Sequence, residues 1–235
     1  MTPTEFVKKA WHKIYYKVIA FDYRIDRIIR YRDPKKYWNQ RGGDTYFDEQ
    51  EVEQHRTLRS QFITDEIKKL QFSSLLEIGC GYGKQIKNLS AKNGVFITGV
   101  DFSRSQLMKA KEYCAGINLN VLEADSESLP LKDKSFDVAF SSAVILHNEP
   151  EKAKRIISEM IRVSRKYLIH NEDVDKAFSR YGYDLTKTYQ GMGFKIVRSS
   201  QIPHAPDPSM TQFTVAELPS GDLKFRPDQI KLQYH

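Results

Sequence analysis

Three glycines alternate with other residues directly after an apolar run, a pattern that can hold a nucleoside. The run is residues 75–78, and Gly79, Gly81 and Gly83 follow it. Eighteen residues after Gly83, the next apolar run ends in Asp101. Glycine lets the backbone approach a ligand where a Cβ atom would collide, and an acidic side chain at the tip of the neighbouring strand can accept both ribose hydroxyls. The pattern predicts a cofactor that contains adenosine.

The spacing of the glycines also bears on which cofactor binds. Dinucleotide sites use G-x-G-x-x-G, in which the third glycine packs a helix against a strand beside a pyrophosphate. This chain has G-x-G-x-G, and Lys84 stands where that third glycine would be. The spacing therefore favours a cofactor without a pyrophosphate and disfavours an NAD-dependent oxidoreductase.

Four segments in order resemble the class I S-adenosylmethionine-dependent methyltransferases, in particular small-molecule, type-11-like members. Residues 75–83 look like motif I of that family, and residues 123–130 look like its adenine-contacting turn. Residues 135–142 resemble the fourth strand, and residues 145–147 the active-site segment after it. The resemblance covers roughly residues 50–217, and four ordered motifs are more specific than one glycine-rich turn.

The resemblance implies a bound S-adenosylmethionine, with S-adenosylhomocysteine as product. It implies that Asp101 accepts the ribose hydroxyls, Asp125 receives the adenine amino group and Glu77 orients the glycine loop or the amino group. Both aspartates also suit simpler roles, as a solvated acid before a helix or as a turn residue. The implied cofactor-binding residues are Glu77, Gly79, Cys80, Gly81, Gly83, Asp101, Phe102, Ala124, Asp125, Ser126 and Ser142.

Methyl transfer needs few chemically active residues, because holding the reactants in line supplies much of the acceleration. His147 follows the predicted fourth strand, on the side where open sheets bind ligands, so it can remove a proton from an acceptor hydroxyl or amine. A histidine that only shapes the pocket is the alternative. The other candidate pocket residues are Arg41, Tyr46, His55, Asn171 and Tyr181.

A polar run ends the predicted fifth strand. It comprises His170, Asn171, Glu172, Asp173 and Asp175, which can line the acceptor pocket. Such runs are usually solvated, and divalent cations need several converging oxygen ligands. We therefore predict no metal site.

Composition and cysteine usage limit the class of protein. A chain of 235 residues with 40% hydrophobic residues can form one α/β domain with an appendage. Cys80 and Cys114 have no CxxC or metal-type spacing, which predicts reduced thiols in a cytoplasmic protein. No apolar run reaches the roughly 18 residues of a membrane span, and the N-terminus is too charged for a signal peptide. Peripheral contact with a membrane stays open.

Helical and strand periodicities alternate along most of the chain, which predicts a parallel sheet covered by helices. The expected fold class is α/β, a Rossmann-like doubly wound sheet that is mostly parallel, with an antiparallel edge hairpin and an N-terminal helical arm. The family often has a Gly-Gly turn before the fifth strand, and Val163 to Tyr167 stand there instead, so a tighter or differently built turn is expected. The predicted strands are 75–78, 95–100, 118–122, 136–140, 167–169, 194–197 and 212–218, and the predicted helices are 52–70, one starting near Ile86, one after Ser103, and 151–164.

Residues 1–48 are predicted to form a basic, aromatic arm or lid, and residues 49–235 the methyltransferase domain. Residues 1–41 hold eleven Lys or Arg against four acidic residues, an excess of seven that equals the net charge of the chain, +7. An amphipathic helix is expected from Thr2, with Pro34 as its stop. Its partner can be the domain, a second copy of the chain in a homodimer, or an anionic membrane surface. Nucleic acid is favoured least, because no RNA-binding signature is present.

Residues 37–47 precede the first helix of the domain. In the resembled enzymes this region folds over the cofactor as a lid, for which Gly42-Gly43 would supply a hinge. The alternative is a surface loop whose aromatic residues form a local cluster.

The leading functional hypothesis is methyl transfer to an oxygen or nitrogen of a small metabolite, such as a sugar or a lipid-linked intermediate. A methyltransferase that acts on membrane lipid or RNA is the alternative within the class. An NAD-dependent oxidoreductase and a cofactor-binding protein without catalysis are the alternatives outside it. Fold alone does not specify the acceptor.

Overall fold

The computed structural model describes residues 32–52, 54–91, 94–117, 119–175, 180–203, 210–221 and 225–233. Nearly all of the predicted N-terminal amphipathic helix lies in residues 1–31, outside the described residues. Within the described ranges, no helix is both long and apolar enough to cross a bilayer.

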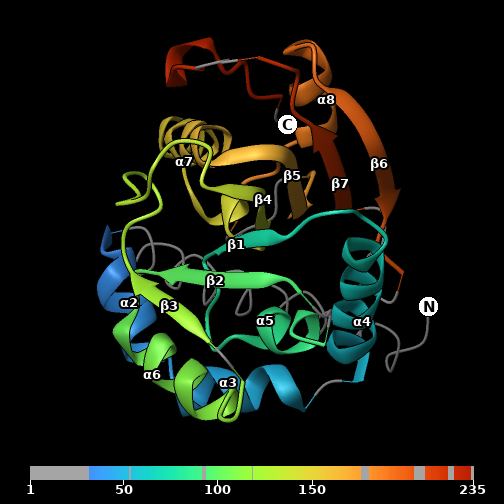
Figure 1. Ribbon diagram of the computed structural model, residues 1–235. Helices are drawn as coiled ribbons and strands as arrows, with labels where there is room; N and C mark the ends of the chain where they lie inside the picture. Colours follow the sequence, from blue (N-terminus) through green and yellow to red (C-terminus); the bar gives the residue numbers. More distant parts are fainter. Residues whose placement is uncertain are drawn as a thin grey trace, which may run out of the picture.

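The centre of the fold is a seven-stranded sheet in the order β3-β2-β1-β4-β5-β7-β6 (Figure 1). The first five strands run parallel, and β7 pairs antiparallel with both β5 and β6. This confirms the predicted mostly parallel sheet with an antiparallel edge hairpin. The strands are β1 (Ser74–Ile78), β2 (Phe96–Asp101), β3 (Asn120–Glu123), β4 (Phe136–Ser142), β5 (Ser164–Asp173), β6 (Lys195–Gln201) and β7 (Thr211–Glu217).

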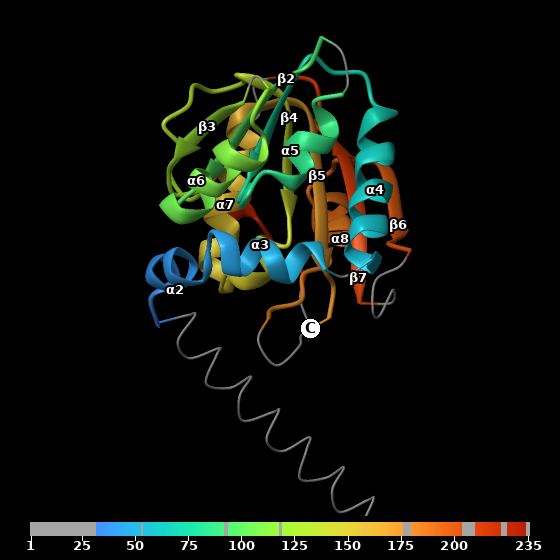
Figure 2. The same cartoon turned by 90° about the horizontal axis from the view of Figure 1, so that it is seen from below.

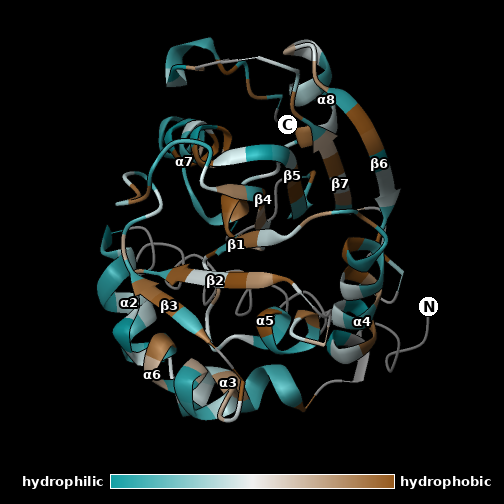
Figure 3. Cartoon of the chain, viewed as in Figure 1, coloured by the Kyte–Doolittle hydropathy of each residue, from teal (hydrophilic) through white to brown (hydrophobic). Residues whose placement is uncertain are grey.

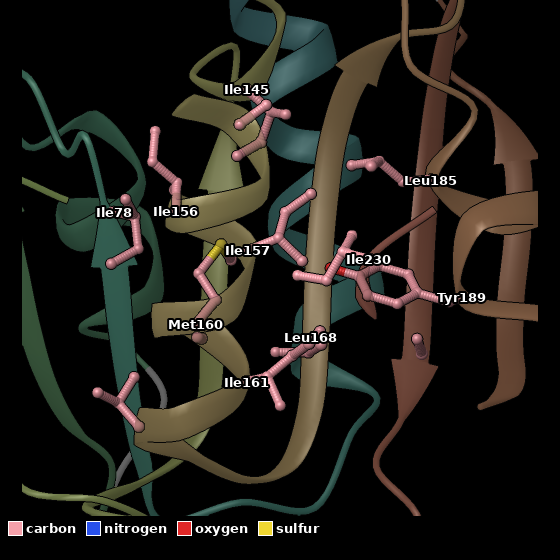
Figure 4. Packing of buried hydrophobic residues seen from close by; sticks show 14 of the residues in the cluster. Ile78, Ile145, Ile156, Ile157, Met160, Ile161, Leu168, Leu185, Tyr189 and Ile230 are labelled. Atoms are coloured by element: carbon pink, nitrogen blue, oxygen red, sulfur yellow. The ribbon is translucent and has the colours of Figure 1, made fainter. Parts of the chain in front are cut away.

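Helices cover both faces of the sheet, and the alternation of side chains along each strand explains why. On one face, Leu75 and Ile169 pack in a cluster with α4 and α5. Their neighbours Leu76 and Leu168 pack with α7 and α8 on the other face, where Ile157 of α7 lies among the isoleucines of the core (Figure 4). Each fully buried aliphatic side chain contributes about 1.5–3 kcal/mol. The helices are α4 (Gln54–Lys68), α5 (Lys84–Leu89), α6 (Arg104–Tyr113), α7 (Pro150–Val163) and α8 (Leu185–Gly191).

The missing Gly-Gly turn before the fifth strand has a direct structural counterpart. α7 ends at Val163 and β5 begins at Ser164, so no residue separates helix from strand. The Ser164 hydroxyl donates to the Met160 carbonyl at 2.7 Å and satisfies an acceptor in the last turn of the helix. The predicted tighter connection is confirmed.

The helix predicted over residues 52–70 is shorter and less buried than expected. α4 begins at Gln54, and Val52 before it is 82% exposed. Leu58 is also exposed, whereas Ile63 and Ile67 are fully buried. Val52 precedes α4, and Leu58 lies about 180° around the helix from Ile67, so neither side chain faces the core.

Two short helices form the segment for which the sequence allowed either a lid or a surface loop. α2 (Pro34–Arg41) and α3 (Asp44–Glu51) flank Gly42-Gly43. Pro34 begins α2, and the Asp33 carboxylate caps it by accepting from the Lys36 amide at 2.9 Å. Both helices lie across one end of the sheet, and α3 is mostly hydrophilic (Figures 2 and 3).

Candidate active site

Two adjoining cavities lie at the carboxyl ends of β1, β2 and β4. The larger has a volume of about 450 Å³ and the smaller about 100 Å³. Ligands of open α/β sheets bind at this edge, where the strand order reverses. The residues that line both cavities are Trp38, Tyr46, Gly79, Gly81, Ser142, Ala143 and His147.

The glycine turn after β1 forms the floor that the two cavities share. Gly79 has a φ of +63°, and a Cβ atom there would lie 2.5 Å from Val144 Cγ2. Gly83 lines neither cavity. A Cβ atom at Gly83 would lie 3.0 Å from Cys114 Sγ, so its backbone allows α5 to pack against α6. The third glycine of the pattern therefore serves helix packing in this fold.

Asp101, the last residue of β2, is fixed to the glycine turn. Its Oδ2 accepts from the Gly81 amide at 3.0 Å, and its Oδ1 accepts from the Ser103 amide at 2.8 Å. Burial raises the pKa of Asp101 from 3.8 to about 6, although these amide hydrogen bonds favour the ionised form. The carboxylate lines the smaller cavity together with Phe102 and Ser126.

Glu77 faces the larger cavity from β1 and is 3% exposed. Its Oε2 has no hydrogen-bond partner among the described residues. Burial, and then the charge of Asp101, raise the pKa of Glu77 well above its usual value. A buried carboxyl without a partner is costly, and a cationic group in the cavity would satisfy it.

Glu172 of β5 accepts hydrogen bonds from the loop that follows β4. Its Oε1 accepts from the Ser141 hydroxyl at 2.8 Å and the Val144 amide at 3.1 Å, and its Oε2 accepts from the Leu146 amide at 3.1 Å. The loop contains Ala143, whose φ is +57°. Burial raises the pKa of Glu172 to about 7.

His170 lies in the same buried network. It hydrogen bonds to the Ser141 hydroxyl through Nδ1 at 2.8 Å and to the Tyr189 hydroxyl through Nε2 at 2.7 Å. Burial lowers the pKa of His170 to about 3, which keeps the imidazole neutral. Asn171 and Asp173, at the alternate positions of β5, line the larger cavity.

His147 ends the 3₁₀ helix η1 (Ile145–His147) and lines both cavities. Its ring centroid lies 5.7 Å from that of Trp38 in α2. The imidazole is therefore at the boundary between the small cavity near Asp101 and the large cavity near Glu77.

Most of the predicted site residues come together in this groove. Gly83, Ala124, Asp125 and Tyr181 line neither cavity, and Asp125 is exposed, with its Oδ1 accepting from the Glu127 amide at 3.1 Å. The side chain of His55 lies outside the described part of the chain. No group of metal-ligating side chains is found among the described residues. The predicted residues that line a cavity are Arg41, Tyr46, Glu77, Gly79, Cys80, Gly81, Asp101, Phe102, Ser126, Ser142, His147 and Asn171.

Sequence reasoning missed three arginines in the wall of the larger cavity. They are Arg56 and Arg59 of α4 and Arg180, which follows β5. Arg59 Nη2 donates to Asn171 Oδ1 at 3.0 Å. The spacing of Arg56 and Arg59 places them on one face of a helix, but charged residues at that spacing usually face solvent, so the sequence carries no signal that sets them apart.

Comparison with known proteins identifies the central part of the chain. Residues 75–167 match a family described as a methyltransferase domain. An O-methyltransferase of Pyrenophora dematioidea is 33% identical over 95 residues, which are 39% of this chain and 35% of that protein. The O-methyltransferase resE of Aspergillus sclerotiorum is 24% identical over 183 residues, which are 67% of this chain and 69% of that protein.

A solved structure shares the fold at low sequence identity. It is phosphoethanolamine N-methyltransferase 1 of Haemonchus contortus, determined with phosphoethanolamine and S-adenosylhomocysteine. The TM-score is 0.68 at 16% identity, over 87% of this chain and 52% of that chain. The chain thus spans about a third of the Pyrenophora protein and about half of the Haemonchus protein.

Together these comparisons show a match to the methyltransferase-domain family over residues 75–167 and, over most of the chain, the fold of a solved methyltransferase.

Proposed function

We propose that this protein transfers a methyl group from S-adenosylmethionine to an oxygen or nitrogen of a small metabolite. The observation that carries the proposal is the buried Glu77 carboxyl, which faces the larger cavity beside Gly79 and has an Oε2 without a partner in the described structure. A carboxylate in this position is matched to a ligand with an amino group. The relatives named as O-methyltransferases support the same class of reaction.

The residues of the groove fit S-adenosylmethionine in three places. Asp101 in the smaller cavity would accept the ribose hydroxyls, with Phe102 beside the adenine. The Gly79 to Gly81 turn leaves room for backbone contact, and Glu77 would bind the amino group of the methionine part. When bound, this cofactor supplies a methyl group on a positively charged sulfur.

The acceptor would lie in the larger cavity, next to His147. We propose that His147 takes the proton that the acceptor nucleophile loses, because its ring lies at the boundary of the two cavities. Trp38 and Tyr46 close the groove from α2 and α3, which limits the access of water to the reacting groups. Residues 34–51 would thus act as the lid of the site.

The experiment that tests the cofactor is calorimetric titration of the full chain with S-adenosylhomocysteine and, separately, with NAD. We expect saturable binding of S-adenosylhomocysteine alone. In Glu77→Gln its affinity should fall about ten- to hundredfold, which corresponds to the loss of a charged hydrogen bond of about 1.5–3 kcal/mol. The same variant should be at least as stable as the wild type, because it removes a buried carboxyl with an unsatisfied oxygen.

Binding of NAD without S-adenosylhomocysteine would establish an oxidoreductase instead. Binding of S-adenosylhomocysteine with no effect of Glu77→Gln would remove the observation on which the proposal depends. His147→Asn tests the base separately, since turnover should fall while cofactor affinity stays within about twofold of the wild type. Unchanged turnover would contradict the role of His147.

A further inference from the structure

Arginine side chains gather in the wall of the larger cavity, on the side formed by α4 and the end of β5. Arg59 donates to the neutral amide oxygen of Asn171 at 3.0 Å. Arg56 Nη1 donates to Gln50 Oε1 at 2.8 Å, and Arg180 Nη1 lies 2.7 Å from Asp173 Oδ2. All three guanidinium groups line the same cavity.

The charge of Arg59 is incompletely balanced. Among the described residues, no carboxylate lies within 4 Å of its guanidinium. Burial lowers the pKa of Arg59, and the nearby charges of Arg180 and Arg56 lower it further, against the opposing effect of Asp173 and Glu172. A guanidinium stays protonated in proteins, so the shift expresses an energetic cost of holding this charge beside two like charges. An anion in the cavity would remove that cost.

The carboxylate of S-adenosylmethionine does not account for this cluster. Arg41 also lines the larger cavity and pairs with Glu49 at 2.6 Å. One carboxylate matches one guanidinium fork, and the cavity offers four arginines. Arg180 is paired with Asp173, so Arg59, whose hydrogen bond goes to a neutral amide oxygen, is the guanidinium best placed to bind a second anionic group.

We propose that Arg59, with Arg56 and Arg180, binds an oxyanion group of the methyl acceptor, either a carboxylate or a phosphate. The inference rests on the proposed function, because it assigns the acceptor to the cavity that His147 and Glu77 face. It narrows the acceptor to a small anionic molecule. The planar fork of a guanidinium matches two oxygens of either group, and this match orients the acceptor as well as holding it.

The first test is anion binding to the full chain in the presence of saturating S-adenosylhomocysteine, which supplies the carboxylate of the cofactor. Inorganic phosphate and succinate are the probes, titrated by calorimetry at constant ionic strength. We expect saturable binding of at least one of them. In Arg59→Met the affinity should fall about ten- to hundredfold, the equivalent of one charge-assisted hydrogen bond. Arg59→Lys should retain part of it, because the charge remains and the fork is lost.

The matched control is Arg198→Met. Arg198 lies in β6 at the edge of the sheet, with its guanidinium 3.4 Å from Glu66 and about half exposed. This variant removes one positive charge from the chain without touching the cavity, so it should bind both anions as the wild type does. Thermal unfolding of each variant checks that the fold is retained, and Arg59→Lys decides the result if Arg59→Met unfolds.

Two results would overturn the proposal. One is the absence of saturable binding of either anion to the wild type, or equal binding by Arg59→Met. The other is a tenfold loss of S-adenosylhomocysteine affinity in Arg59→Met, which would assign Arg59 to the cofactor. Failure of the proposed function gives a different result, because the wild type would then not bind S-adenosylhomocysteine. In that case, titration of the anions in the absence of S-adenosylhomocysteine would still show whether Arg59 binds an anion.

A second arm separates the two sources of the oxyanion. Polar metabolites from a cell extract are incubated with the protein and S-adenosylmethionine labelled on the methyl group, with and without prior phosphatase treatment. Label that binds an anion-exchange resin and disappears after phosphatase identifies a phosphate ester, and label that persists identifies a carboxylate. Label confined to metabolites that do not bind the resin contradicts the proposal.

Discussion

Two acidic side chains, Glu77 and Asp101, face the groove from neighbouring strands. Glu77 is buried and Asp101 is half-buried, and desolvation raises the pKa of each. Among the described residues, no basic side chain is bonded to either carboxylate, so a bound ligand would lower the free-energy cost of holding both charges there. A cation near Glu77 and hydroxyl donors near Asp101 are the groups that would relieve it.

Asp101 makes cofactor affinity depend on pH. In the proposed site the ionised form of Asp101 would accept the ribose hydroxyls, and the pKa of Asp101 in the free protein is about 6. We therefore expect the affinity for S-adenosylhomocysteine to fall as the pH is lowered through about 6. Calorimetry between pH 5 and pH 8 measures this. Asp101→Asn should bind weakly at every pH and lose the part of the dependence that Asp101 causes, and a wild-type affinity that does not change over this range would contradict the assignment.

The same shift affects stability without cofactor, with the opposite sign. The pKa of Asp101 is raised from 3.8 to about 6 on folding, so the stability it contributes below pH 3.8 is lost as the pH rises through about 6. The loss is up to about 3 kcal/mol at 1.36 kcal/mol per pH unit. Urea unfolding should show Asp101→Asn gaining on the wild type between pH 4 and pH 7. The comparison between the two proteins removes the opposing contribution of His170, which is common to both.

At this scale the sequence predicted the cofactor half of the groove better than the acceptor half. The glycines, Glu77 and Asp101 have a fixed spacing because a single turn and its neighbouring strand position them. Arg59 and Asn171 are 112 positions apart and meet only because α4 packs beside the end of β5. Asp125 shows that a match to the motif does not by itself place a side chain in the groove. Its residue type and position fit the motif, but its side chain is exposed.

The loop after β4 depends on one side chain of the adjacent strand. Glu172 accepts from two backbone amides of that loop and from the Ser141 hydroxyl in β4, and a glutamine has only one oxygen to offer. We expect Glu172→Gln to lower the free energy of unfolding by about 1–3 kcal/mol, as for buried amides that lose an acceptor. Urea unfolding measures this. Stability equal to that of the wild type would show that the loop is held by its own turn geometry.

The turn between α2 and α3 depends on a close approach of the backbone. A Cβ atom on Gly42 would lie 2.6 Å from the Trp38 carbonyl oxygen and 2.3 Å from Ser105 Oγ. We expect Gly42→Ala to shift α2 away from α6, which lowers stability by about 1–3 kcal/mol and weakens S-adenosylhomocysteine binding through Trp38.

Gly191→Ala is the matched control for that variant. Gly191 ends α8, and a Cβ atom there meets nothing within 4 Å. It should leave cofactor affinity unchanged and stability the same or slightly higher. If Gly42→Ala binds S-adenosylhomocysteine as Gly191→Ala does, α2 and α3 do not contribute to the cofactor site.

Prediction of the elements worked where a local pattern decides the structure. Ser103 caps α6 as its sequence indicates, with the hydroxyl accepting from the Gln106 amide at 3.5 Å. Val52 and Leu58 are more exposed than the apolar pattern predicted, because Val52 precedes α4 and Leu58 lies on the face opposite Ile67. The two helices over the groove were missed as helices, since Gly42-Gly43 interrupts the segment and neither helix has a strong apolar stripe.

Over the whole molecule, the fold class and the antiparallel edge hairpin followed from alternating periodicity and from the family resemblance. The net positive charge of the chain is concentrated at its N-terminus. Residues 1–41 hold an excess of seven positive charges, and most of that segment lies before the described residues.

The central claim is methyl transfer to a small molecule, and a transfer assay tests it most directly. The full chain is incubated with S-adenosylmethionine labelled on the methyl group and with cell extract, which is then separated into polar metabolites, lipids and RNA. Asp101→Ala serves as the blank. The account predicts label above the blank in the polar metabolites, in the fraction that binds an anion-exchange resin. Label above the blank only in lipid or RNA, or in no fraction while the wild type binds S-adenosylhomocysteine, would contradict it.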